Sequence, residues 1–143
     1  MRTRTVAGAI ALAAVGVLAA MSQTGGGAAA KPSASVARGK YLVVNVGNCR
    51  DCHTPMDKKG QFIKSQELQG TALMFKPTIP IAGWMPVAPG IAGLPGWTDE
   101  QGVEFFTTGK KPDGSMAAPP MPEFRFNKGD AAAVVAYLKS LKP

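Results

Sequence analysis

The chain of 143 residues contains a single histidine and only two cysteines. One histidine excludes a catalytic triad combined with histidine metal ligands, a histidine-rich metal site, and any cofactor held between two imidazoles. Aromatic residues make up 7% of the sequence and charged residues 17%, whereas 45% is hydrophobic. This composition is that of a globular chain, and the length predicts one small domain.

The first thirty residues have the pattern of a secretory signal peptide. Arg2 and Arg4 precede an uncharged apolar run over residues 6–21, and the small residues Ala28-Ala29-Ala30 form a cleavage signal. The run is shorter than the roughly 20 residues of a transmembrane helix, so cleavage is favoured over a retained membrane anchor. We therefore expect a signal peptide over residues 1–30 and a mature domain over residues 31–143. That domain would be periplasmic or otherwise exported, and soluble after cleavage.

Basic residues exceed acidic ones, giving a formal net charge of +7 from 16 Lys and Arg and 9 Asp and Glu. Loss of Arg2 and Arg4 with the leader leaves +5 on the mature chain. Because no basic stripe is interleaved with aromatic residues, nucleic acid is not expected as a partner. The charge fits either steering toward an acidic partner protein or a solubilising surface.

Three segments of the mature chain have helical periodicity. They cover residues 35–48 with Ser35 as N-cap, residues 98–108 with a capping box at Thr98, and the residues that follow Asn127. Gly39 lies inside the first segment, where glycine costs about 1 kcal/mol relative to alanine. Such a glycine predicts that another backbone approaches closely.

A proline- and glycine-rich stretch without strand alternation joins the first two helices over residues 56–97. A loop of this length is uncommon in so small a domain. Three short helices also bury too little apolar surface for a robust core unless a prosthetic group is added. The sequence predicts an all-α fold of about three to four helices, with long loops wrapped around something other than protein.

Cys49-Arg50-Asp51-Cys52-His53 has the C-x-x-C-H spacing at which c-type haem is attached. At this spacing two thiols can reach the two vinyl groups on one edge of the porphyrin, and the adjacent histidine then binds the iron. Arg50 and Asp51 are expected to be under little chemical constraint. A zinc site would need a fourth ligand, a thioredoxin-like pair would need a βαβ context, and a disulfide would leave the histidine unexplained. We predict one haem c, bound covalently through two thioethers.

The second iron ligand should be a methionine, because the chain has no second histidine. Met121 lies in Pro119-Pro120-Met121-Pro122, where the flanking prolines stiffen the backbone. Met116 is the main alternative, and Met74, Met85 or an open site remain. His53 and Met121 are thus the predicted metal ligands.

Across nearly all of the mature chain the sequence resembles the monohaem class I c-type cytochromes. The resemblance rests on Gly39 and Tyr41, Cys49–His53, Leu68-Gln69-Gly70, Trp97–Glu100, Pro119–Pro122 and Asp130–Leu141. It implies that Met121 is the axial ligand and that the first helix crosses the last, with Gly39 and Tyr41 against the Tyr137-Leu138 face. In many members a proline before the Leu-x-Gly element accepts the proton of the proximal histidine. Here Ser65-Gln66-Glu67 precede Leu68, so the acceptor for His53 is open.

The predicted function is single-electron transfer between redox partner proteins, since filled axial positions leave no site for a substrate. The chain would be a carrier and not an enzyme, with unknown donor and acceptor. One alternative is a subunit or membrane-tethered cytochrome of a dehydrogenase or oxidase complex. Another is an open-site haem protein that binds a gas or peroxide. Membrane contact is expected only through an uncleaved leader or a membrane-bound partner complex.

Overall fold

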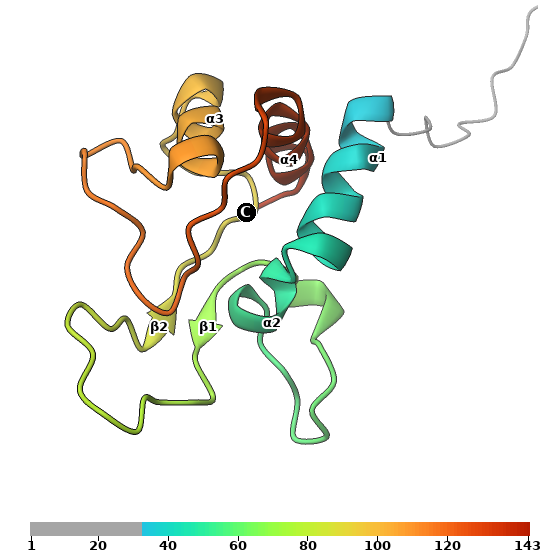
Figure 1. Ribbon diagram of the computed structural model, residues 1–143. Coiled ribbons are helices and arrows are strands. Elements are labelled where there is room, and N and C mark those ends of the chain that lie inside the picture. The colour runs from blue at the N-terminus through green and yellow to red at the C-terminus, as the bar shows by residue number, and fades with distance from the viewer. Residues whose placement is uncertain (1–32) are drawn as a thin grey trace, which may run out of the picture. The chain divides into compact units, whose positions relative to one another are not determined.

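The computed structural model describes residues 33–143 (Figure 1), so the predicted signal peptide lies outside the described residues. Four α-helices and one two-stranded sheet confirm the all-α class. Within residues 33–143 no helix is both long and apolar enough to span a bilayer. The elements are α1 (Ala34–Tyr41), the π-helix η1 (Leu42–Val46), α2 (Cys49–His53), the 3-10 helix η2 (Lys64–Gln66), β1 (Thr71–Ala72), β2 (Val87–Ala88), α3 (Asp99–Thr108) and α4 (Lys128–Ser140).

The first helix differs from the prediction at both ends. Its N-cap is Ser33 rather than Ser35, and the Ser33 hydroxyl accepts the Val36 N–H at 3.3 Å. The last turn widens into η1, where the Gly47 N–H donates to the Leu42 carbonyl at 2.7 Å. Asn48 adopts a left-handed conformation with φ of 48°. This residue therefore separates the first helix from α2, and the haem-attachment sequence forms a short helix of its own.

The second and third predicted helices are confirmed, because their end signals are local. Thr98 and Gln101 form a reciprocal capping box at the start of α3, and Gly109 ends it with φ of 79°. At the start of α4, the Asn127 side chain accepts the Asp130 N–H at 2.9 Å.

Helices α1 and α4 are in close contact at Gly39, as its position predicted (Figure 1). A Cβ atom on Gly39 would overlap the Ala133 carbonyl oxygen and lie 2.7 Å from the Tyr137 Cβ. Tyr41, in contrast, is 51% exposed, and the Arg38 guanidinium carbon lies over its ring, 5.6 Å from the ring centroid. Position 39 therefore requires glycine, because the α4 backbone occupies the space that a side chain would need.

Replacing Gly39 by alanine should lower the free energy of unfolding by about 1–3 kcal/mol, the usual range for an overpacked contact. Helix propensity alone would predict the opposite change. Denaturant unfolding followed by circular dichroism measures the effect, with Lys40→Ala at the exposed neighbouring position as the control. A Gly39→Ala protein as stable as the parent would show that the two helices can separate without penalty.

An ion pair closes the same contact between α1 and α4. The Arg38 Nε lies 2.9 Å from Asp130 Oδ1, and a second guanidinium nitrogen donates to Asp130 Oδ2 at 3.1 Å. The bond to Arg38 lowers the pKa of Asp130 below its ordinary value, and Asn127 contributes in the same direction. A lowered folded-state pKa stabilises the fold above the unfolded-state pKa, and this contribution is lost as the pH falls through the folded-state value.

Asp130→Asn should accordingly flatten the loss of stability below about pH 4, near the ordinary pKa of aspartate. Arg38→Gln should flatten the same part of the curve, because it removes the partner that lowers the pKa. The measurement is the free energy of unfolding between pH 2.5 and 7 for the parent and both variants. An unchanged acid slope in Asp130→Asn would assign the acid sensitivity to other carboxylates.

The core is formed by the facing sides of α1, η1, α3 and α4 together with the loops around Leu68 and Leu94. Its buried members include Leu42, Val43, Leu68, Phe106, Val134, Val135 and Leu138. The two strands pair antiparallel at one side, with Thr71 opposite Ala88 and Ala72 opposite Val87. This pairing holds together the two ends of the long loop over residues 73–86.

Candidate haem-binding site

Helix α2 brings Cys49, Cys52 and His53 to one face, because residues three and four apart lie together on a helix. Both cysteines are free thiols, Cys49 buried and Cys52 half-buried. His53 is 5% exposed. The structure therefore presents two thiols and one sequestered imidazole side by side, the donor set that covalent haem attachment requires.

Burial controls the protonation of all three groups. It raises the pKa of the Cys49 thiol to about 11 and also raises that of Cys52, where the Asp51 carboxylate adds to the effect. Burial lowers the pKa of His53, opposed by its hydrogen bond to Pro89. At neutral pH the site thus holds two S–H groups, the species that adds across a vinyl bond, and a neutral imidazole, the species that binds a metal.

The imidazole of His53 is oriented by the carbonyl of Pro89, whose oxygen lies 2.7 Å from Nδ1. A carbonyl oxygen can only accept, so Nδ1 carries the proton and the lone pair is on Nε2. The acceptor that the sequence left open is therefore 36 residues beyond His53, immediately after β2, and not before Leu68. Fixing one ring nitrogen in this way selects the other as the metal ligand.

Two hydrogen bonds join the end of α2 to the segment before β1. The Leu68 N–H donates to the buried Thr54 hydroxyl at 2.9 Å, and the Gly70 N–H donates to the His53 carbonyl at 2.8 Å. These bonds hold the backbone of His53 independently of its side chain.

The segment before β1 and the segment after β2 pack closely together at Gly70 and Gly90. Gly70 has a φ of +87°, and a Cβ there would lie 2.6 Å from the Gly90 nitrogen. A Cβ on Gly90 would lie 2.9 Å from the Gln69 carbonyl oxygen. Neither position has room for a side chain, so the two backbones pack closely and hold the Pro89 carbonyl next to His53.

Arg50, between the cysteines, is more constrained than the sequence indicated. Its Nε lies 3.2 Å from the Glu67 carboxylate, and its guanidinium lies 4.7 Å from the centroid of the Phe62 ring. Arg50 therefore ties α2 to the loop before Leu68, although it carries no ligand atom.

Met121 lies in the bend predicted to be stiff. It is partly buried, and its N–H donates to the Ala118 carbonyl at 3.0 Å. The same loop is held from outside, since the Met85 N–H donates to the Pro119 carbonyl at 2.8 Å. The backbone around Met121 is thus fixed within the loop and against the segment that leads into β2.

The other candidate methionines occupy different surroundings. Met116 is 45% exposed, and its terminal methyl group lies against Gly109. Met74 and Met85 are more exposed still. Among these four methionines, Met121 is therefore the least exposed.

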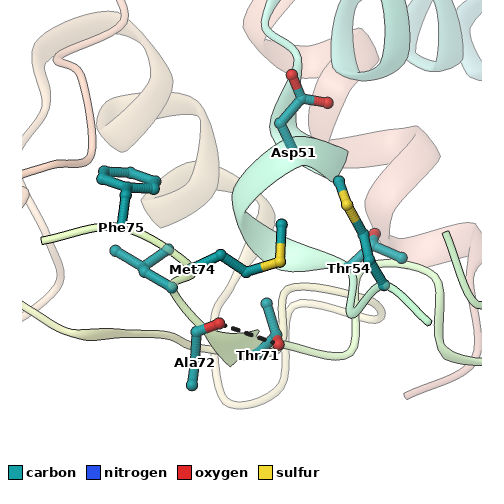
Figure 2. Close-up of a pocket in the computed structure, with 8 residues that line it drawn as sticks. Asp51, Thr54, Thr71, Ala72, Met74 and Phe75 are labelled. Atoms are coloured by element: carbon teal, nitrogen blue, oxygen red, sulfur yellow. Dashed lines mark hydrogen bonds between the residues drawn. The ribbon is translucent and has the colours of Figure 1, made fainter. Parts of the chain in front are cut away.

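A small cavity of about 40 Å³ lies between α2 and the residues around β1 (Figure 2). Asp51, Thr54 and Met56 line one part of it, and residues 71–75 line the rest, with the Met74 side chain directed toward α2. The loop beyond β1 therefore begins next to the helix that carries the cysteines.

Apolar side chains that a porphyrin ring could contact are concentrated in that loop. Trp84 packs edge-on against Phe75 with centroids 5.8 Å apart, whereas Trp97 is partly buried against the core beside Phe105. Large exposed apolar residues of the loop are Met74, Phe75, Ile79, Ile81, Met85 and Val87. With the two thiols and the oriented imidazole, these residues fit a covalently attached haem.

The comparison with known proteins agrees with this donor set. The family model described as cytochrome c matches residues 36–142, so the chain belongs to the cytochrome c family. The resemblance to class I c-type cytochromes is confirmed, and the class is that of a haem electron carrier. Among curated proteins, the chain is similar to the cytochrome c subunit of a quinone alcohol dehydrogenase from Gluconobacter oxydans (strain 621H), with 31% identity over 117 residues. That match covers 74% of this chain and 24% of the relative, about a quarter of the relative's length.

Proposed function

We propose that this chain is an exported monohaem cytochrome c that passes single electrons between redox partner proteins. One haem would be joined to Cys49 and Cys52 by thioethers, with His53 and Met121 as iron ligands. The observation that carries the proposal is the 2.7 Å contact between His53 Nδ1 and the Pro89 carbonyl oxygen, in a C-x-x-C-H helix whose Cys49 and His53 are buried. When bound, the haem supplies a reversible one-electron couple.

The residues of the chain would orient the iron ligands and exclude water from the site. The Pro89 carbonyl accepts a hydrogen bond from the Nδ1–H group of His53 and so keeps the ring in one orientation and Nε2 free for the metal. Met121, fixed in its proline-rich bend, would offer a neutral thioether to the iron. The apolar loop over residues 74–87 would exclude water from the site, and a drier site favours the state of lower net charge.

Export is supported by the sequence of residues 1–30, and the mature domain would comprise residues 31–143. Intact mass spectrometry of the protein secreted by a host with haem-attachment machinery tests both points. The expected mass is that of residues 31–143 plus one haem. A retained leader would contradict export as a cleaved soluble protein, and a chain without added haem would contradict the proposed cofactor.

A second candidate is a cytochrome subunit of a dehydrogenase complex, which the name of the relative from Gluconobacter favours. In that role the same ligands would serve, but the partner would be permanently associated. Purification under mild conditions distinguishes the two. Recovery as a free small protein favours a diffusing carrier, whereas recovery with a dehydrogenase favours the subunit.

A further inference from the structure

The segment from Met85 to Pro89, which contains β2, is hydrogen-bonded at its two ends to the two elements that carry the proposed iron ligands. At one end the Pro89 carbonyl accepts a hydrogen bond from His53 Nδ1, with 2.7 Å between the oxygen and the nitrogen. At the other end the Met85 N–H donates to the Pro119 carbonyl at 2.8 Å. Pro119 lies two residues before Met121 in the same loop.

The segment is also braced along its length. It pairs with β1, and the Leu73 N–H donates to the Pro86 carbonyl at 2.9 Å just beyond the paired residues. The chain that leads into β1 is in turn held to α2 by the bond from the Gly70 N–H to the His53 carbonyl. The segment is therefore connected to His53 in two ways. Pro89 is hydrogen-bonded to the imidazole directly, and β1 with the preceding Gly70 links the segment to the His53 backbone.

Its length and composition limit how far the two ends can separate. Four peptide steps span at most about 14 Å, and the proline rings at positions 86 and 89 fix two of the φ angles. A short, braced segment of this kind acts as a spacer between the elements at its ends.

We infer that the Met85–Pro89 segment is a positioning element that sets the separation between the His53 imidazole and the Met121 loop. The group that transmits this to Met121 is the backbone N–H of Met85. The inference rests on the proposed function, because it takes His53 and Met121 as the ligand pair. Weakening the bond between Met85 and Pro119 should release Met121 from the iron before the fold itself is lost.

A matched pair of substitutions at position 85 isolates that N–H. Met85→Pro removes the donor, while Pro86 already biases residue 85 toward the extended region, part of which proline can adopt. Met85→Leu removes the thioether and keeps the donor. Both variants are prepared as the secreted, haem-loaded chain, and the methionine–iron band of the ferric protein is followed in denaturant together with far-ultraviolet circular dichroism.

In the parent and in Met85→Leu the band and the helical signal should disappear together. In Met85→Pro the band should disappear first, with the ratio of methionine-bound to methionine-free iron lowered roughly three- to tenfold, as expected for one lost hydrogen bond. Coincident loss of both signals in Met85→Pro would overturn this inference and leave the proposed function intact. Absence of the band in the parent would overturn the proposed function, and its loss in Met85→Leu alone would overturn Met121 as the ligand.

Amide hydrogen exchange of the parent protein provides a test that needs no variant, should Met85→Pro fail to accumulate. The Met85 N–H should exchange at least about 100-fold more slowly than the amide of the exposed Lys58 in the same sample. Exchange of the two amides at similar rates would show that the Met85 N–H is not held, and the inference would be wrong.

Discussion

Met121→Ala should abolish the near-infrared band that a methionine-ligated ferric haem shows, while the haem remains attached. The two cysteines that would carry the thioethers and His53 lie on α2, and nothing in the hydrogen bonding of His53 involves the Met121 side chain. Loss of a thioether ligand should also lower the reduction potential by on the order of 100 mV, a part of the range of about 0.8 V that axial ligands span. Optical spectroscopy and a redox titration of the purified protein measure both effects.

Met116→Ala is the matched control for this prediction. Met116 lies in the same loop but is 45% exposed beside Gly109, so its removal should leave the band and the potential unchanged. If Met116→Ala loses the band and Met121→Ala keeps it, the assignment of the ligand is reversed. If the parent protein binds carbon monoxide readily in its ferrous state, the open-site alternative holds instead.

The double variant Cys49→Ala/Cys52→Ala should contain no covalently attached haem and should accumulate poorly. Both thioether positions are then absent, and a small chain with a thin core loses the stabilisation that a bound prosthetic group gives its folded state. A pyridine haemochrome assay on acid-extracted protein measures the attached haem, which should fall to background.

Asp51→Asn serves as the control, because Asp51 is an exposed residue between the two cysteines and contributes no attachment atom. It should retain one haem per chain. Full haem retention in the double cysteine variant would contradict covalent attachment through α2. The single variants Cys49→Ala and Cys52→Ala should each keep one thioether, which shifts the haemochrome absorption maximum without removing the haem.

Features encoded by neighbouring residues were predictable from the sequence. The capping box at Thr98 and Gln101 and the asparagine cap at Asn127 place the starts of α3 and α4 correctly, because each cap satisfies amides only three residues away. The C-x-x-C-H spacing likewise places three side chains on one helical face. Gly39 indicated a close backbone contact through its cost in a helix, and Ala133 supplies that contact.

Features that depend on distant residues were not predictable in the same way. The strand pair joins Thr71 to Ala88 through two residues on each side, too few for any alternation to show. Pro89-Gly90 indicates only a turn in the sequence, yet Pro89 orients His53 from 36 residues away. The pairing of Arg50 with Glu67 also joins residues that no local pattern connects.

The contact between α1 and α4 has a consequence for the order in which the chain can fold. Arg38 and Asp130 are 92 residues apart, so their pairing closes a loop that contains α2, the sheet and α3. Closing a loop of that size carries an entropy cost of about 4 kcal/mol on the (3/2)RT ln n scale, which only the completed core can offset. A chain synthesised from its N-terminus thus has no partner for α1 until the last helix is made. Termination of translation before Asn127 should leave the chain, α1 included, open to proteases.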